Sequence, residues 1–302
     1  MVEDLLSENG LSLERLQSFC RVAVAGGVTR AAKGDATKQS LYSRQIKELE
    51  EFFGAELMRR KGRGIALTPI GQRLHSITRE QFVALNDFKT ECRGQPLNIV
   101  IGAGDSLIQW LLLPRLAAIE KRQPNAQHTF LNLTNAEIIH RLNDGLLDFG
   151  VVRKGEATKP LGSAPLGRVV FSLFVPKAMQ SRSKPNQFGE FIGTLPLAVL
   201  EGEGNFRQEL RTIARKSNLR LNVKVECSSF PLVAKALAGG ALAGILPSMA
   251  AAELRQVGMV EIPSKALQAF DREICLAWNP RQLRVRSALE KARSSILESA
   301  RF

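Results

Sequence analysis

Hydrophobic residues in the N-terminal third of the chain recur every three or four positions, which is the spacing of amphipathic helices. The segment Leu13–Ala25 predicts a first helix, with Ser12 as its N-cap and Gly26-Gly27 at its end. A short second helix is predicted to open at Thr29 and to run through Ala31-Ala32. Two helices this close together favour a helix-turn-helix.

A third helix is predicted over residues 38–54, with one apolar and one polar face. Because Lys38 cannot accept a backbone N–H, we expect Thr37 to cap this helix. The apolar face is expected to bury Leu41, Ile46, Leu49 and Phe53. The opposite face carries Gln39, Ser40, Ser43, Arg44 and Lys47. Such a face suits the DNA major groove, because Arg and Gln pair with base edges while Ser and Lys hold phosphate oxygens.

A basic turn follows this helix. It contains Arg59, Arg60, Lys61 and Arg63, and Gly62 and Gly64 permit a tight reversal of the chain. The pattern predicts the hairpin wing of a winged helix-turn-helix, lying along the sugar-phosphate backbone.

These motifs together resemble the LysR-type transcriptional regulators. The resemblance is carried by Ala31-Ala32, Gln39 to Ile46, Leu49-Glu50, Gly54 to Leu57, Arg60 to Arg63, and Leu67-Thr68 with Gly71. The chain departs from the family pattern at Asp35, Lys38 and Leu41-Tyr42, and these departures leave the base preference open. Residues expected to contact DNA are Thr29, Lys38, Gln39, Ser40, Ser43, Arg44, Lys47, Arg60 and Arg63. For Thr29, capping of the short helix is an equal alternative.

A long helix is predicted to start at Thr68-Pro69 and to continue to about Arg93. Its apolar positions are Ile70, Leu74, Ile77, Phe82, Leu85 and Phe88. A seam of this kind requires a partner, so we expect a linker helix through which the protein forms a homodimer, and dimers could pair further into tetramers. The alternative is packing against its own domain. In a dimer, two recognition helices would address half-sites roughly 34 Å apart.

After Gly94-Gln95-Pro96 the pattern changes to alternating strands and helices, which predicts a parallel sheet covered on both faces. Strands are expected at 97–101, 128–133, 148–152, 169–175, 197–200, 223–227, 244–246 and 273–278, and helices at 106–122, 136–142, 206–216, 231–238 and 287–299. With crossovers near 160–166 and 264–271, this part resembles the two-lobed, Rossmann-like fold of type 2 periplasmic binding proteins. The segment LNDGLLDFGVV also resembles LysR-type effector domains.

The expected fold class is therefore α/β, in three parts. Residues 1–67 form a winged helix-turn-helix, 68–94 the linker helix, and 95–302 the effector-binding domain. Within the last part, lobe I comprises 95–163 and 269–302, and lobe II comprises 164–268.

In open α/β sheets a ligand lies beyond the carboxyl ends of the strands, where helix N-termini offer N–H groups to anions. The residues that this rule selects for the effector site are Ser106, Thr134, Arg153, Asn205, Phe206, Ser229 and Phe230. Alternatives remain for most of them. Ser106 and Ser229 could simply cap helices, Arg153 could form a surface salt bridge, and both phenylalanines could pack in the core.

The net charge of +13 suits a polyanionic partner such as double-stranded DNA. The second half is also basic, which indicates either an anionic ligand or an ordinary solvated surface. The four cysteines lack metal-ligand spacing and the three histidines are isolated, so we expect neither a metal site nor a cofactor. The opening segment MVEDLLSENG lacks the apolar core of a secretory signal, and no apolar run suits a bilayer, so we expect a cytoplasmic protein without a membrane partner.

The leading interpretation is a sequence-specific DNA-binding regulator, controlled by a small metabolite between two lobes and not an enzyme. An alternative is a two-lobed binding protein or enzyme with an accessory DNA-binding domain, but the sequence shows neither a nucleophile-base pair nor paired carboxylates. Nonspecific DNA compaction would fit the charge but not the two-lobed half.

Overall fold

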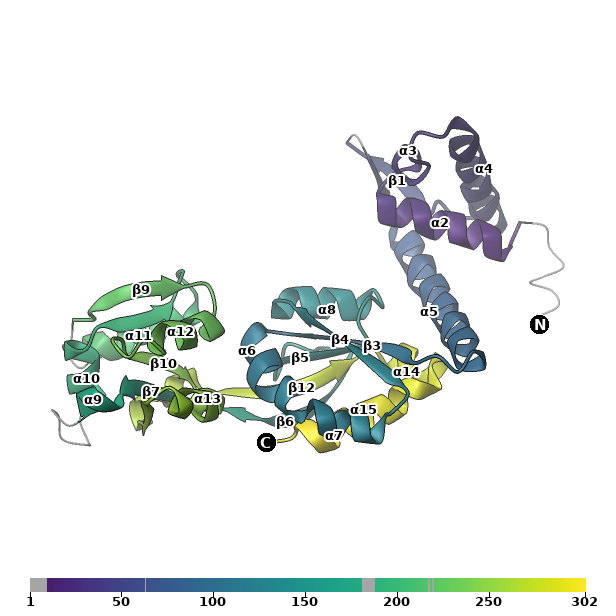
Figure 1. Cartoon of the computed structure of the whole chain (residues 1–302). Coiled ribbons are helices and arrows are strands. Elements are labelled where there is room, and N and C mark those ends of the chain that lie inside the picture. The colour runs from purple at the N-terminus through teal and green to yellow at the C-terminus, as the bar shows by residue number, and fades with distance from the viewer. Residues whose placement is uncertain (1–9, 63, 181–187, 217, 219) are drawn as a thin grey trace. The chain divides into compact units, whose positions relative to one another are not determined.

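The computed structural model describes residues 10–62, 64–180, 188–216, 218 and 220–302 (Figure 1). The chain divides into two compact units. The first comprises Met1–Gln95 with Arg284–Arg286, and the second comprises Pro96–Leu283 with Ser287–Phe302. No helix in the described ranges is both long enough and apolar enough to span a bilayer.

In its described residues, the first unit consists of three helices, a hairpin and a long helix. Its elements are α2 (Leu13–Ala25), α3 (Val28–Ala31), α4 (Ala36–Phe53), β1 (Met58–Lys61), β2 (Gly64–Leu67) and α5 (Pro69–Cys92). The predicted ends of the first helix are confirmed, because Ser12 accepts the N–H of Arg15 and Gly26 adopts a left-handed φ of 65°. A core formed around Phe19, Leu49 and Leu57 holds these elements together.

Helix α4 begins earlier than the sequence suggested. Asp35 is its N-cap, because one carboxylate oxygen accepts the backbone N–H groups of Thr37 and Lys38 at 3.0 and 3.1 Å. The prediction that Thr37 caps the helix is therefore wrong. Asp35, one of the departures from the family pattern, supplies the acceptor that Lys38 cannot.

The buried face of α4 also differs from the prediction. Ile46 and Leu49 are buried as expected, but Leu41 and Phe53 remain 37% and 39% exposed. Tyr42 and Gln45 occupy the interior instead. The buried stripe is thus rotated around the helix relative to the predicted one.

The wing is an antiparallel pair in which Met58 lies opposite Leu67 and Lys61 opposite Gly64. Glu50 on α4 anchors its base, because one carboxylate oxygen accepts the N–H groups of Leu57 and Met58 at 2.8 and 3.2 Å. The predicted start of the long helix is confirmed, with Thr68 as N-cap and Pro in the first turn.

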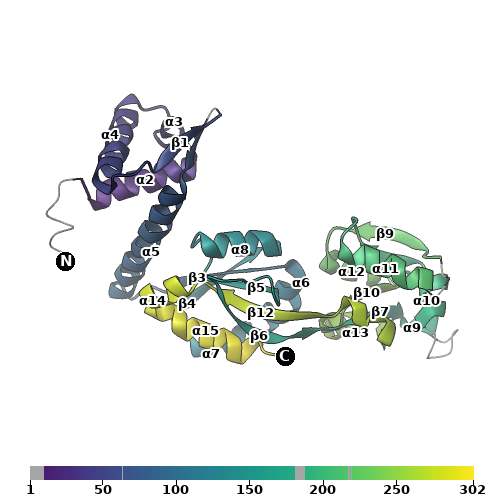
Figure 2. The ribbon, with the colours of Figure 1, turned by 180° about the vertical axis from the view of Figure 1, so that it is seen from behind.

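The second unit contains a five-stranded sheet in the order β4-β3-β5-β12-β6. Strands β3, β4 and β5 run parallel, while β12 is antiparallel to both β5 and β6. Their bounds are β3 Leu97–Ala103, β4 Ala126–Asn132, β5 Phe149–Arg153, β6 Gly162–Val169 and β12 Arg272–Trp278. Helix α8 (Asn135–Asn143) covers one face, and α7 (Leu116–Arg122) and α15 (Ser287–Ala300) cover the other (Figures 1 and 2). These elements form the first lobe.

The second lobe contains an antiparallel sheet, β10-β7-β11, and a parallel pair, β8-β9. A bridge between Leu197 and Ala243 connects the pair to β10. The strands are β7 Phe171–Pro176, β8 Leu197–Leu200, β9 Val223–Cys227, β10 Gly244–Pro247 and β11 Met259–Pro263. The helices are α9 Lys177–Gln180, α10 Phe188–Thr194, α11 Asn205–Lys216, α12 Phe230–Leu237, η3 Ser248–Ala250, α13 Ala251–Gln256 and η4 Lys265–Phe270, and α14 (Pro280–Val285) follows β12.

The chain crosses between lobes at two single residues. Val170 separates β6 from β7, and Asp271 separates η4 from β12. The first crossover therefore lies later than the expected 160–166, because residues 162–169 pair with β12 in the first sheet. The strand expected at 169–175 corresponds to β7 in the second lobe, and only its first residue, Val169, belongs to β6 in the other sheet.

The helix expected at 106–122 is not uniform. It runs through α6 (Asp105–Leu107), a π-helical turn η1 (Ile108–Leu112) and a 3-10 turn η2 (Leu113–Arg115) before α7. Pro114 within η2 has no N–H to donate to the preceding turn, so regular α-helical bonding cannot continue through it.

Candidate DNA-binding surface and interlobe cleft

The polar face of α4 is accessible from outside the first unit. Lys38, Ser40, Ser43, Arg44 and Lys47 are exposed, and Gln39 is half-buried. The side chain of Arg44 is 72% exposed and lies 3.6 Å from Glu48, and Lys47 lies 3.5 Å from Glu51. Because exposed ion pairs contribute little, both cations can exchange these partners for DNA at small cost.

Thr29 lies in α3 beside this helix and is exposed. The N-cap of α3 is Gly27, which offers no side chain. Thr29 therefore does not cap the short helix, and its hydroxyl is available for a phosphate oxygen.

The wing adds basic groups. Arg59, Arg60 and Lys61 are exposed along β1, while Arg63 lies outside the described residues. A notch of about 430 Å³ separates α3 from the wing, and Thr29, Arg30 and Arg60 are among the residues that line it. Those predicted DNA-contact residues that the structure describes thus come from three neighbouring elements of one unit, α3, α4 and β1.

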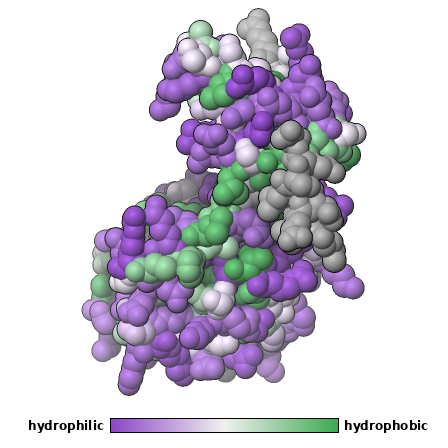
Figure 3. All heavy atoms as spheres, turned by 90° about the vertical axis from the view of Figure 1, so that its right-hand side faces the viewer, coloured by the Kyte–Doolittle hydropathy of each residue, from purple (hydrophilic) through white to green (hydrophobic). Residues whose placement is uncertain are grey.

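The linker helix α5 presents apolar side chains to solvent, and Figure 3 shows hydrophobic surface gathered along it. Leu74 packs against the core of the first unit. Ile70, Ile77, Leu85 and Phe88 are exposed, the last two by 54% and 64%. Within the described part of the first unit, packing on its own domain therefore accounts for only part of the seam.

A cleft of about 790 Å³ opens between the two lobes of the second unit. Four of the predicted effector residues line it: Ser106, Thr134, Arg153 and Phe230. The other three, Asn205, Phe206 and Ser229, do not appear among its lining residues.

The side chain of Thr134 caps the helix that follows it, α8. It forms a reciprocal capping box on α8, in which its hydroxyl donates to Glu137 at 2.8 Å and accepts the N–H of Glu137. The backbone N–H and then the hydroxyl of Thr134 lower the pKa of the Glu137 carboxyl. Ser106 is different, because the N-cap of α6 is Gly104. The Ser106 hydroxyl caps no helix, so the capping alternative does not hold for it.

The charges of the cleft are mixed. Arg153 forms no ion pair with any described residue, whereas its neighbour Lys154 pairs with Glu273 at 2.5 Å. Arg272, which the sequence analysis missed, donates to the carbonyls of Ala269 and Asp271 at 2.7 and 2.8 Å. Asp105, Glu137 and Glu156 add carboxylates to the same lining. Arg272 opens β12, so extending the predicted strand by one residue would have placed it at the crossover.

Aromatic side chains form the wall of the cleft on the side of the second lobe. Phe230 and Phe171 both line the cleft, with ring centroids 5.6 Å apart. Phe206 packs behind them, 5.1 Å from Phe230 and 4.8 Å from Phe270. Phe206 therefore packs in the core of the second lobe, which was the alternative to a place in the effector site. Ser229 takes the capping alternative, because its hydroxyl accepts the N–H of Leu232 at 3.3 Å.

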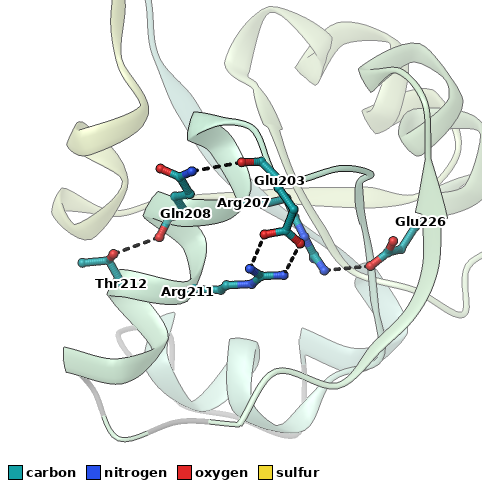
Figure 4. Close-up of polar contacts among 6 residues, drawn as sticks. All are labelled: Glu203, Arg207, Gln208, Arg211, Thr212 and Glu226. Carbon is teal, nitrogen blue, oxygen red and sulfur yellow. Dashed lines mark hydrogen bonds and ion pairs between the residues drawn. The ribbon is translucent and has the colours of Figure 1, made fainter.

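Asn205 opens α11, and a network of polar contacts holds the start of this helix (Figure 4). Arg211 donates to both carboxylate oxygens of Glu203 at 2.5 and 2.7 Å, and this hydrogen bonding lowers the pKa of Glu203. Arg207 reaches across to Glu226 on β9 at 2.7 Å. The network ties the loop before α11 to the helix itself and the helix to β9.

In the described ranges, no three His, Cys, Asp or Glu side chains are arranged to hold a metal ion. The four cysteines are free thiols. Burial raises the pKa of the Cys20 thiol to about 11, so at neutral pH it is protonated and a poor nucleophile.

Comparison with known proteins agrees with both halves of the chain. The family model described as a bacterial regulatory helix-turn-helix protein, lysR family, matches residues 13–72. The family model described as the LysR substrate binding domain matches residues 94–299. A Synechococcus elongatus protein described as a probable nitrogen assimilation transcriptional activator is 25% identical over 284 residues, which cover 90% of each chain.

Two solved structures have a similar fold. Full-length LysG from Corynebacterium glutamicum with bound effector Arg has a TM-score of 0.66 at 16% identity, over 96% of this chain and 98% of that one. Vibrio fischeri DarR in complex with DNA has a TM-score of 0.50 at 18% identity, over 92% and 98% of the two chains.

Proposed function

This chain belongs to the LysR family of bacterial helix-turn-helix regulators, and from that premise we propose that it reads a specific operator through α4 under the control of a small metabolite in the interlobe cleft. As a member of the family it is a DNA-binding transcriptional regulator with an effector-binding domain, and it is not an enzyme. The proposed functional boundaries are 1–67, 68–94 and 95–302.

The observation that carries the DNA-binding proposal is the exposed polar face of α4 beside the basic strand β1. Arg44 and Gln39 can each make two hydrogen bonds to a base edge, while Ser40, Ser43 and Lys47 can hold phosphates. Arg60 and Thr29, on either side of the notch, extend the phosphate contacts away from the groove. We include Lys38 and Arg63 in this surface on the basis of the sequence.

We propose that two chains associate through the exposed apolar side chains of α5. A symmetric pair would bury Leu85 and Phe88 and present two copies of α4 to one face of DNA. Half-sites would then lie about 34 Å, or one helical turn, apart. Because the partner is chromosomal DNA, we place the protein in the cytoplasm.

We propose that the effector is small and carries at least one anionic group. Arg153 supports this reading, because it lines the cleft without an ion-pair partner among the described residues and its guanidinium can bind a carboxylate with two hydrogen bonds. Ser106 can add a hydroxyl donor. The carboxylates of Asp105 and Glu156 in the same lining restrict the class, because they would repel a ligand that carries several negative charges.

Ligand control follows from the two lobes. An effector that binds one arrangement of the lobes more tightly shifts the population toward that arrangement, by no more than the difference between the two affinities. In an oligomer, such a shift changes the spacing of the DNA-binding units and hence the bend or length of the bound site.

The test of this function is selection of genomic fragments by the full-length protein at moderate salt, followed by footprinting. A long protected region with an interrupted palindrome is expected. Uniform binding without a preferred site, weakened steeply by salt, would contradict sequence-specific regulation. Metabolites suggested by the neighbouring genes would then be tested by thermal shift on the wild type and on Arg153→Gln, and an anionic effector should shift only the wild type.

A further inference from the structure

The carbonyl oxygen of Gly26 connects three elements of the DNA-binding unit. Gly26 ends α2 in the left-handed conformation. Its carbonyl accepts the guanidinium Nη2 of Arg30 on α3 at 2.6 Å and the backbone N–H of Ile65 on β2 at 3.3 Å. The contact with Arg30 is short because the donor is charged and the acceptor lies at the negative end of a helix dipole.

The start of β2 also lies close to this guanidinium. A Cβ added at Gly64 would lie 3.1 Å from Nη2 of Arg30 and 3.4 Å from the Gly26 carbonyl oxygen. A side chain at this position would therefore crowd the Arg30 guanidinium. Directly across the β1–β2 pair, Arg60 lies opposite Ile65. The hydrogen bond from Ile65 to the Gly26 carbonyl therefore fixes the strand opposite Arg60, and the Arg30 guanidinium lies beside that hydrogen bond.

We propose that Arg30 is the positioning residue of the wing. Its planar guanidinium holds the end of α2 and the start of β2 together, so that Arg60 stands at a fixed distance from the recognition helix α4. This role rests on the proposed DNA-binding function, and it differs from a phosphate contact because it depends on the shape of the guanidinium rather than on its charge alone.

Two substitutions of Arg30 separate the effect of the shape of its side chain from the effect of its charge. Arg30→Lys keeps the positive charge but loses the planar fork, and Arg30→Ala loses both. Arg59→Ala is the matched control, because it removes one exposed positive charge from β1 without touching Gly26. Each full-length variant is examined by amide hydrogen exchange of peptides covering residues 60–67, and by titration with a mixed-sequence DNA duplex over a range of salt.

We expect Arg30→Lys and Arg30→Ala to speed exchange in the wing by about tenfold or more, since Arg30→Ala removes the charge-assisted hydrogen bond to Gly26 and both remove the planar group that lies beside Gly26 and Gly64. Both should also weaken binding to the duplex by about tenfold. Arg59→Ala should leave wing exchange unchanged, while it weakens binding and reduces the salt dependence through the loss of one positive charge.

Wild-type behaviour of Arg30→Lys in both measurements would overturn the proposal, because charge alone would then suffice. Fast wing exchange with unchanged DNA affinity would also overturn it, since the position of the wing would not matter for binding. If the wild type itself showed no salt-dependent DNA binding, the proposed function would fail, while hydrogen exchange would still decide whether Arg30 positions the wing.

Discussion

The indole N–H of Trp110 donates to the carboxylate of Glu253 at 2.8 Å, and the same oxygen accepts the side-chain amide of Gln109, also at 2.8 Å. Trp110 lies in the π-helical turn of the first lobe, whereas Glu253 lies on α13 of the second. All other buried members of the hydrophobic cluster around Trp110, including Phe174 and Leu246, come from the second lobe. The two lobes are therefore joined by a buried side chain as well as by the two crossovers.

We expect Glu253→Ala to reduce the free energy of unfolding of the effector-binding unit by about 1 kcal/mol, because it leaves the buried indole N–H of Trp110 without its acceptor. Glu253→Gln keeps an acceptor oxygen and should cost less. Urea denaturation followed by tryptophan fluorescence measures both, in a Trp278→Phe background that leaves Trp110 as the reporter. Equal stability of Glu253→Ala and the wild type would show that this contact does not hold the lobes.

Arg44 is placed to read a base, because it is exposed in the middle of the polar face of α4. Arg44→Ala should weaken binding to the selected operator by about 1–3 kcal/mol and relax the preference at one base pair. Arg60→Ala is the comparison, and it should weaken binding to all sequences and flatten the salt dependence. The assignment of α4 as the recognition helix would be wrong if Arg44→Ala bound its operator normally.

Asp35 makes the stability of the DNA-binding unit depend on pH in the acid range. Hydrogen bonds from the backbone and then the side chain of Lys38 lower the pKa of this carboxyl from its ordinary value of 3.8. Because the folded-state pKa is depressed, the stabilisation is present above the unfolded pKa and is lost as the pH falls through the folded pKa.

Asp35→Ala should therefore lower stability at neutral pH, and the difference from the wild type should shrink below the lowered pKa. Asp35→Ser retains a cap that does not titrate and should lose this pH dependence. Urea denaturation at neutral and acid pH, monitored by hydrogen exchange in α4, compares the three proteins. A deficit in Asp35→Ala that is the same at every pH would contradict this origin.

Leu85 and Phe88 provide the test of the linker interface. Leu85→Glu places a charge in the proposed apolar contact and should weaken self-association by about 2 kcal/mol or more. Gln72→Glu adds the same charge at an exposed polar position on the opposite side of the same helix and should leave association unchanged. Sedimentation velocity over a range of concentrations measures both, and an unchanged Leu85→Glu oligomer would exclude α5 as the interface.

The sequence predicted best those features that local chemistry determines. Ser12, Gly26 and Thr68 define helix ends by the hydrogen bonds they make with their own neighbours, and the structure places all three helix ends as predicted. Asp35 was not predicted as the N-cap of α4, because the family pattern has Ser or Thr at position 38 and so places the helix start later. The buried role of Tyr42 was missed because Leu41 fits an apolar stripe equally well by composition.

Features that depend on distant partners could not be predicted. Residues 162–169 contain two glycines and a proline, so they read poorly as a strand, yet β12 and the C-terminal residue hold them. The N–H of Phe302 donates to the carbonyl of Leu166 at 2.9 Å. In the cleft, Arg272 and Asp105 are 167 residues apart in sequence, and no local pattern brings them together. The set of residues that line the cleft is therefore the part of the candidate site to which the structure adds most.

Gly71, in the first turn of α5, shows how closely the wing and the linker helix approach each other. A Cβ at this position would lie 2.0 Å from the carbonyl oxygen of Leu57, an atom of the backbone that cannot rotate away. The Leu57 carbonyl also accepts the N–H of Thr68 at 3.0 Å, so moving it would disturb the start of α5. Gly71→Ala should therefore destabilise the DNA-binding unit by about 3 kcal/mol and reduce DNA binding with it.

Gly27→Ala is the control for stability, because the nearest neighbours of its added Cβ would lie at 3.8 and 3.9 Å, in ordinary contact. Thermal unfolding compares both variants, and titration with duplex DNA tests Gly71→Ala. If Gly71→Ala matched the control in stability, the close approach of Leu57 to α5 would not exist in solution, and the rigid connection from wing to linker helix would have to be abandoned.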